Sequence, residues 1–138
     1  MQNLDPYLTF DGTCADAMRF YQQTLGGKLE LLTLKETLPP DQVPEGSGHR
    51  IMHSRLTVPG GVIMASDSQV GVPYKGMHGF SISLLYKDVE EGRRIFEALA
   101  DGGRVTMPFG ETFWAQGFGM CADRFGTPWM VSGGENKE

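Results

Sequence analysis

In the first part of the chain, the order of apolar and polar residues predicts strands and a helix in turn. Residues 6–11 form a short apolar run, which predicts a strand. Between residues 15 and 25, apolar side chains recur at helical spacing and stop at Gly26 and Gly27, which predicts a helix. Residues 28–35 alternate charged and β-favouring side chains and predict a second strand. Prolines and glycines between residues 36 and 48 then predict a long irregular surface loop.

A hairpin is predicted next, because the β-rich segments 50–58 and 62–67 are separated by Pro59, Gly60 and Gly61. Successive side chains of a strand point to opposite faces, so the segment 50–58 divides into two sets. One set is Ile51, His53, Arg55 and Thr57. The other is Met52, Ser54, Leu56 and Val58, which we expect to face the core.

The second half of the chain repeats the order of the first. Residues 80–86 predict a strand, and Asp88 is the expected N-cap of a helix that ends before Gly102. Three further strands are expected at 104–107, 118–122 and 129–132, with a turn at 123–126. A constant offset of 76 residues places Leu84 on Leu8 and Phe96 on Phe20. This internal repeat predicts an α+β fold of two βαβββ modules.

The length of 138 residues fits one domain, 1–138, made of a first module 1–75 and a second module 76–138. A helix covers one face of each short sheet, and the other face needs a partner. We therefore expect the two modules to form a curved mixed sheet around a pocket in which a ligand would bind.

Composition narrows the classes of partner. Hydrophobic residues make up 40% and charged residues 21% of the chain, as in an ordinary globular domain. The net charge of -5, without a local Lys/Arg stripe, argues against nucleic acid as a partner. No apolar run is long enough to span a membrane and residues 1–5 lack a signal-peptide pattern, so we expect a cytoplasmic protein. Cys14 and Cys121 stand alone and are expected to be reduced, structural thiols.

His53 and Asp67 are candidate ligand-binding residues in the first half. His53 faces either solvent or an interface, or it lines the cavity as a hydrogen-bond donor or general base. Asp67 either orients His53 across the hairpin or caps a turn. His49 and His78 lie beside glycines in expected loops, so a three-histidine metal site is not expected.

The segment 111–118 is expected to be an irregular connection, yet it concentrates Phe113, Trp114 and Phe118. These aromatic side chains either plug the open end of the sheet, form a subunit contact, or face a ligand as a lid. If they face a ligand, they form with Trp129 a wall suited to a planar or amphipathic organic molecule. The candidate partners for its polar groups are Glu111, Gln116 and Arg124.

Four groups of residues carry a resemblance to a known superfamily. They are 17–21 with 25–27, 51–56 with 64–67, 105–108 leading into 111–114, and 123–126 with 129–130. In these segments the chain resembles the PhnB-like branch of the vicinal oxygen chelate superfamily, which includes glyoxalase I, extradiol dioxygenases and bleomycin-binding proteins. The resemblance implies a glyoxalase-like fold and a homodimer, in some relatives with exchanged halves.

The resemblance also implies where a metal would bind, on the first strand and on the last or near-last strand of each half. Those positions carry Pro6, Met64, Ser81 and Met130 here, and none of the four is the His, Glu or Gln that metal-using members place there. We therefore expect no metal and no other cofactor. Some relatives carry the name of a demethylubiquinone methyltransferase, but no glycine-rich turn of a doubly wound sheet occurs here to hold adenosylmethionine.

The function expected from these observations is binding of an unidentified small organic molecule, with no assigned catalytic residue. One alternative is a lyase or isomerase that uses His53, Asp67 and Glu111 as an atypical metal set, or His53 alone as a base. Another is a homo-oligomeric interaction protein that associates through the aromatic segment.

Overall fold

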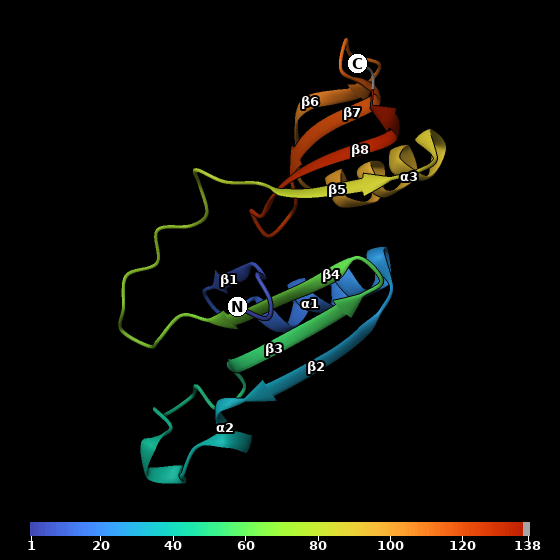
Figure 1. The fold of residues 1–138 in the computed structure, drawn as a ribbon. Coiled ribbons are helices and arrows are strands. Elements are labelled where there is room, and N and C mark those ends of the chain that lie inside the picture. The colour runs from blue at the N-terminus through green and yellow to red at the C-terminus, as the bar shows by residue number, and fades with distance from the viewer. Residues whose placement is uncertain (137–138) are drawn as a thin grey trace. The chain divides into compact units, whose positions relative to one another are not determined.

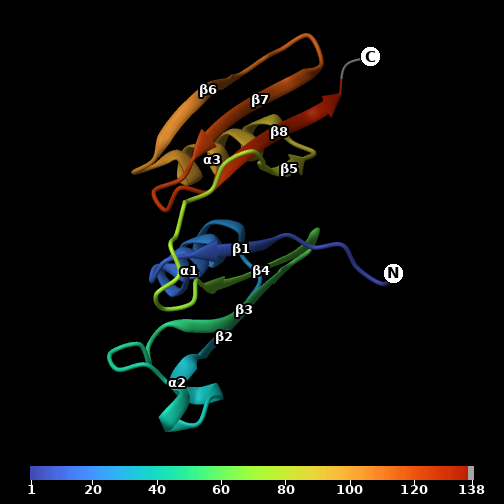
Figure 2. The same ribbon diagram turned by 90° about the vertical axis from the view of Figure 1, so that its left-hand side faces the viewer.

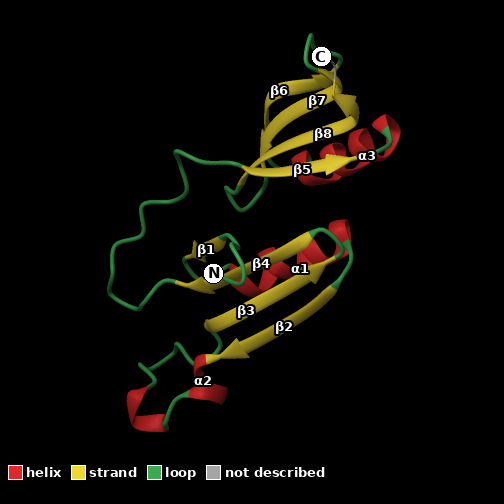
Figure 3. Cartoon of the chain, viewed as in Figure 1, coloured by secondary structure: helices red, strands yellow, loops and turns green. Residues whose placement is uncertain are grey.

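The computed structural model describes residues 1–136, and the chain divides into two compact units, Met1–Lys75 and Gly76–Glu138. Each unit is a four-stranded mixed sheet with one long helix, coloured by element type in Figure 3. The predicted α+β class and the glyoxalase-like order of elements are confirmed. We describe each unit by itself.

The first unit contains β1 (Tyr7–Phe10), α1 (Cys14–Leu25), β2 (Lys28–Thr33), α2 (Leu34–Thr37), η1 (Pro40–Gln42), β3 (Ile51–Val58) and β4 (Gly61–Asp67). Its strands are ordered β1-β4-β3-β2, with β1 parallel to β4 and the other pairs antiparallel (Figure 1). The predicted strands and helix are all present.

The expectation of an irregular loop over residues 36–48 is wrong in part. The helix α2 overlaps its start, because Thr33 and Glu36 form a capping box in which each side chain binds the other residue's backbone N–H. The short helix η1 begins at Pro40, where proline's missing N–H costs nothing because the first amides of a helix have no partner within it.

The core of the first unit lies between α1 and one face of the sheet. The buried residues of α1 are Cys14, Ala17, Met18 and Tyr21. They pack with the buried side chains of the sheet, among them Leu8, Phe10, Leu56 and Ala65. Each large apolar side chain removed from water here contributes about 1.5–3 kcal/mol to folding.

Strand β3 departs from simple alternation at its start. Leu32 pairs with His53 and Thr33 pairs with Ile51, so Met52 is an extra residue in the ladder, a β-bulge. Ser54 and Leu56 are buried as predicted. The prediction is wrong for Met52, which is 46% exposed, and for Ile51, which is 2% exposed and belongs to the core. The bulge reverses the face of every residue before it.

The second unit contains β5 (Ile82–Tyr86), α3 (Val89–Ala100), β6 (Arg104–Gly110), β7 (Ala115–Ala122) and β8 (Pro128–Asn136). The strand order β5-β8-β7-β6, with β5 parallel to β8, repeats that of the first unit. The predicted N-cap is confirmed, because the Asp88 carboxylate accepts a 3.1 Å hydrogen bond from the Glu91 backbone N–H. Residues 115–118 lie in β7, so the expectation of an irregular segment 111–118 is correct only up to Trp114.

Two glycines of β7 leave room for aromatic rings from α3 and β6, and Figure 2 shows α3 along the sheet of the second unit. A Cβ atom added at Gly119 would stand 2.8 Å from the Phe96 ring, and one at Gly117 would stand 2.7 Å from the Phe109 ring. Both distances are too short for real Cβ contacts. The space that these glycines leave on β7 is therefore filled by aromatic rings. Across residues 1–136, no helix has both the length and the apolarity needed to span a bilayer.

Candidate functional site

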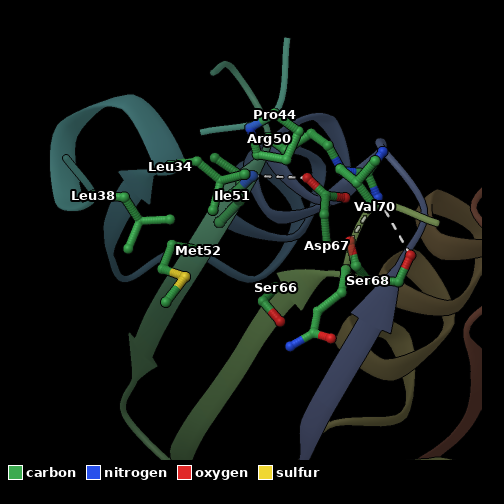
Figure 4. A pocket seen from close by; sticks show the side chains of 11 residues that line it. Leu34, Leu38, Pro44, Arg50, Ile51, Met52, Ser66, Asp67, Ser68 and Val70 are labelled. Carbon is green, nitrogen blue, oxygen red and sulfur yellow. Dashed lines mark hydrogen bonds between the residues drawn. The ribbon is translucent and has the colours of Figure 1, made fainter. Parts of the chain in front are cut away.

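A cavity of about 440 Å³ opens in the first unit, where β3 begins and β4 ends (Figure 4). Its lining comes from the segment between β2 and β3, from the two strands and from the chain after β4. The lining residues are Leu34, Leu38, Pro44, Arg50, Ile51, Met52, Ser66, Asp67, Ser68, Gln69 and Val70. The volume falls in the range of cavities that hold small organic molecules.

The walls of this cavity differ in chemistry. Leu34, Leu38 and Met52 lie together on one side in Figure 4, and Ser66, Asp67 and Ser68 lie on the other. Met52 reaches the cavity because the bulge turns it out of the core. One apolar wall facing a few polar groups suits an amphipathic molecule whose apolar part is buried and whose polar part is oriented by hydrogen bonds.

Asp67 lines the cavity, but its carboxylate binds the backbone. Oδ1 accepts hydrogen bonds from the N–H groups of Gly12 at 2.7 Å and Cys14 at 3.1 Å, and Oδ2 accepts one from Ile51 at 2.8 Å. The carboxylate therefore ties the start of α1 and the start of β3 to the end of β4. Of the two roles considered for Asp67, this arrangement is the capping role, extended over segments distant in the sequence.

Arg50 supports the same corner of the unit. Its Nη2 donates to the Asp11 carboxylate at 3.0 Å and to the Ser68 carbonyl oxygen at 2.8 Å. The Arg50 side chain is mostly buried, whereas that of Asp11 is more than half exposed. Arg50 therefore holds the chain that leaves β4 against the loop that follows β1, and with Asp67 it fixes the mouth of the cavity.

His53 lies on the sheet face that α1 does not cover. Ser54 marks the α1 side, because its hydroxyl lies 3.5 Å from the Cys14 thiol. His53 Nδ1 lies 3.2 Å from the Tyr7 hydroxyl oxygen, and the two rings are stacked with centroids 5.8 Å apart. Either the hydroxyl donates to Nδ1 or a protonated Nδ1 donates to the hydroxyl. The structure thus joins His53 with Tyr7, a residue that the sequence did not single out.

Of the four aromatic candidates in the second unit, three lie together and the fourth, Trp129, lies elsewhere. The Trp114 ring lies 4.7 Å from that of Phe113 and 5.4 Å from that of Phe118, both edge-on. Trp129 is fully buried, and its indole N–H donates to the buried Asp123 carboxylate at 2.8 Å. Trp129 pairs with Cys121 in the sheet, so it lies on the opposite face from Phe118.

The polar candidates of the second unit have partners within it. Gln116 Oε1 accepts a 3.2 Å hydrogen bond from the Glu135 backbone N–H. Arg124 donates to the Asp101 carbonyl oxygen through Nε and Nη2 and forms a 3.2 Å ion pair with the Asp101 carboxylate. Glu111 lies in the short connection between β6 and β7. The turn and the end of α3 are therefore joined by Arg124.

Neither cysteine has the lowered pKa of a reactive thiol. Burial raises the pKa of Cys14 to about 12, and the nearby Asp67 carboxylate adds to the effect while the Ser54 hydrogen bond opposes it. Burial and the Asp123 carboxylate raise the pKa of Cys121 to about 11. Both sulfur atoms are therefore neutral thiols at physiological pH, as a structural role requires.

Potential metal ligands do not cluster in the part of the chain that the structure describes. Within residues 1–136, no group of three or more His, Cys, Asp and Glu side chains could hold an ion. At two of the positions that the resemblance implies, the Met64 backbone N–H donates to the Pro6 carbonyl oxygen at 3.1 Å. These two positions are therefore neighbours across β1 and β4, but their side chains are a ring without donors and a thioether.

Several residues of the cavity were missed by sequence reasoning. Arg50 directly precedes β3, and Met52 is its second residue. Leu34, the first residue of α2, lay in the segment 28–35 that was expected to be a strand, and Leu38, the C-cap of α2, lay in the segment expected to be irregular. One signal was available for α2, because Thr33 and Glu36 have the spacing of a capping box. No local pattern shows that Met52 is a bulged residue, since the bulge depends on pairing with β2.

Two βαβββ units define the class of protein by its fold, which is glyoxalase-like. The fosfomycin resistance protein FosX from Listeria monocytogenes shares this fold, with a TM-score of 0.64 at 11% identity over 98% of this chain and 94% of that one. The chain belongs to the family described as 3-demethylubiquinone-9 3-methyltransferase, which matches residues 2–132.

Similar proteins agree with this assignment. Protein YjdN of Escherichia coli (strain K12) is 38% identical over 138 residues, covering 94% of this chain and 93% of its own. The crystal structure of protein PA1353 from Pseudomonas aeruginosa has a TM-score of 0.90 at 44% identity, covering 97% of this chain and 98% of that one. The PhnB protein from Bacillus cereus has a TM-score of 0.77 at 25% identity, covering 96% and 99%. The predicted PhnB-like relationship is confirmed.

Proposed function

We propose that this protein binds a small amphipathic organic molecule and does so without the metal that is usual in its superfamily. The observation that carries the proposal is the cavity of about 440 Å³ with apolar side chains on one wall and polar groups on another. Such a cavity can bury most of a small ligand and orient it by a few hydrogen bonds.

The metal-free part of the proposal is supported by chemistry at the implied ligand positions. Pro6, Met64 and Met130 offer no oxygen or imidazole nitrogen in their side chains, and Ser81 offers only a neutral hydroxyl in place of a carboxylate, amide or imidazole. Asp67, a carboxylate that lines the cavity, already accepts three backbone hydrogen bonds.

We do not extend the methyltransferase activity in the family's description to this chain. Adenosylmethionine and similar nucleotides are typically held at the glycine-rich turn of a doubly wound parallel sheet. Within residues 1–136, each sheet has four strands and a single parallel pair, β1 with β4 and β5 with β8. The fold therefore favours a binding function built on the βαβββ unit.

The binding function can be tested with a thermal-shift screen of planar and amphipathic compounds on the tag-free protein. A compound at 100 times its dissociation constant stabilises the folded state by about 2.7 kcal/mol, which gives a clear rise in Tm. Met52→Trp should fill the cavity and abolish the rise. The matched control is Val72→Trp, at an exposed residue that does not line the cavity, and it should keep the rise.

Two results would count against this function. If no compound raises the Tm of the wild-type protein, the small-molecule function is wrong. If Met52→Trp responds as the wild type does, the ligand binds outside this cavity. Elemental analysis of the same preparation tests the second part, because near-stoichiometric divalent metal would contradict a metal-free site.

A second candidate function is self-association through the aromatic segment in a cytoplasmic homodimer. Phe113 is 87% exposed although it packs against Trp114, which is unusual for a large apolar side chain. Multi-angle light scattering of the wild type and of Phe113→Ser would test this function. A dimer that Phe113→Ser converts to a monomer supports it, and a monomeric wild type contradicts it.

A further inference from the structure

We propose that the face of the first sheet opposite α1 binds the carboxylate of a small organic anion, with Arg55 as its charged contact. This inference rests on the proposed function, because it takes the ligand to be a small molecule. It goes further by assigning that molecule a negative charge and by naming its charged contact, Arg55, a residue that the sequence did not single out.

The fold places three polar side chains, those of Tyr7, His53 and Arg55, on this face. Ser54 and Leu56 point toward α1 and are buried, so His53 and Arg55 point to the other side of β3. Two residues along a strand are about 7 Å apart, which brings these side chains into one neighbourhood. Arg55 pairs with Met64 of β4, and Met64 pairs with Tyr7 of β1. Tyr7, His53 and Arg55 therefore surround Met64.

Arg55 is the member of this group whose charge is unmatched. Its Nε is buried without a hydrogen-bond partner, and within residues 1–136 no ion pair or hydrogen bond of its guanidinium is formed. Glu30 pairs with Arg55 across β2 and β3, but its carboxylate lies 3.7 Å from the Lys28 ammonium group instead. The carboxylate directly opposite Arg55 in the sheet therefore forms no ion pair with it.

A partly buried guanidinium without a partner favours an incoming anion. Removing a charge from water costs free energy, and a bound counter-charge recovers it. The planar fork of an arginine matches a carboxylate with two parallel hydrogen bonds, which lysine cannot form. Arg50 Nε is likewise buried without a partner, but Arg50 differs from Arg55 because its Nη2 already binds the Asp11 carboxylate and the Ser68 carbonyl oxygen.

Neighbouring groups define the rest of the ligand. The Tyr7 and His53 pair adds a hydroxyl and an imidazole, which supply hydrogen bonds to a second oxygen of the anion. Met64 and the half-exposed Leu32 provide apolar surface beside these groups. The face therefore suits a carboxylate attached to an apolar, planar body.

Naphthalene-2-carboxylate and naphthalene-2-carboxamide form a matched pair of probes, which differ in charge but hardly in shape. We expect the carboxylate to bind the wild-type protein about tenfold more tightly, measured by calorimetry, which corresponds to ~1.4 kcal/mol. In nitrogen-proton NMR spectra, the Arg55 Nε–Hε signal should shift with the carboxylate and not with the amide.

Three variants test the role of Arg55. Arg55→Met should lose the preference for the carboxylate, and Arg55→Lys should keep a smaller preference, because it retains the charge without the fork. Arg19→Met should leave the preference unchanged, because Arg19 is an exposed residue of α1. The Arg55 signal of the wild type keeps the test independent of how well the variants fold.

Equal binding of the two probes, or a carboxylate preference that survives in Arg55→Met, would overturn this inference and leave the proposed function intact. Binding of neither probe would also overturn it, whereas only failure of the whole compound screen overturns the proposed function. An Arg55 signal that shifts on dilution of the free protein would show that a second copy occupies the face, and would overturn the inference too.

Discussion

Replacing Asp67 by alanine should destabilise the first unit by several kcal/mol, because one carboxylate joins three segments of backbone. The bonds to the N–H groups of Gly12, Cys14 and Ile51 measure 2.7, 3.1 and 2.8 Å. The bond to Gly12 is exposed, so water can replace it. The other two are partly buried, and hydrogen bonds to charged groups contribute ~1.5–3 kcal/mol each, so we expect a loss of ~3–6 kcal/mol.

Asp67→Asn keeps the shape but replaces one acceptor oxygen by a donor that faces an N–H group. We expect it to lose about half as much, ~1.5–3 kcal/mol. Urea titrations should be followed by amide signals of the first unit, because both tryptophans lie in the second unit and fluorescence would report only there. The control is Asp16→Ala, at an exposed carboxylate paired only with Arg19, which should change stability by less than ~0.5 kcal/mol.

A change below ~0.5 kcal/mol for Asp67→Ala would refute this reasoning, since that is the size of an ordinary surface substitution. The same variant separates the two roles considered for Asp67. If it abolished ligand binding while leaving stability unchanged, Asp67 would be a ligand contact and not a backbone clamp.

Three further predictions concern thiol reactivity, helix capping and packing. Cys14, with its pKa raised to about 12, should react with Ellman's reagent only after unfolding. The Cys14 thiol ionises at lower pH in the unfolded chain than in the folded one, so the free energy of unfolding should fall as pH rises from about 9 toward 12. Urea titrations at several pH values would measure this fall. Thr33→Ala should raise the lowered pKa of Glu36 toward its ordinary value in an NMR titration, because the Thr33 side chain is the largest cause of the lowering; an unchanged pKa would contradict this. Gly119→Ala should cost ~1–3 kcal/mol in urea unfolding, because its Cβ would meet an α3 ring, whereas Gly110→Ala, with open space, should cost little; equal losses would contradict this.

Much of the fold could be predicted because local patterns specify it. Asp88 starts α3 where a capping aspartate was expected, and the repeat at a fixed offset gives the second unit the strand order of the first. These features depend on residues a few positions apart, so the sequence displays them directly. The first turn of α2 was missed because the prolines that follow it dominated the pattern, although Thr33 and Glu36 already had capping spacing.

The candidate site was less predictable because it depends on contacts between distant residues. Asp67 lies 55 residues from Gly12 in the sequence, and Tyr7 lies 46 residues from His53. Nothing local distinguishes Arg55, whose charge is unmatched, from Arg50, whose charge is paired. The aromatic segment was recognised from its composition, but only the strand register separates Trp129 from Phe118.

The bulge at Met52 lets β3 place two consecutive side chains, Met52 and His53, on the face opposite the core. Before the bulge, Met52 contributes to the cavity, while Ile51 packs in the core. After it, the usual alternation places His53 and Arg55 on the face opposite α1. Mutations that reshape the cavity at position 52 therefore need not disturb the pairing of the strand or the polar residues beyond it. A single inserted residue would let the size preference of such a protein diverge among relatives while its charged contacts are inherited unchanged.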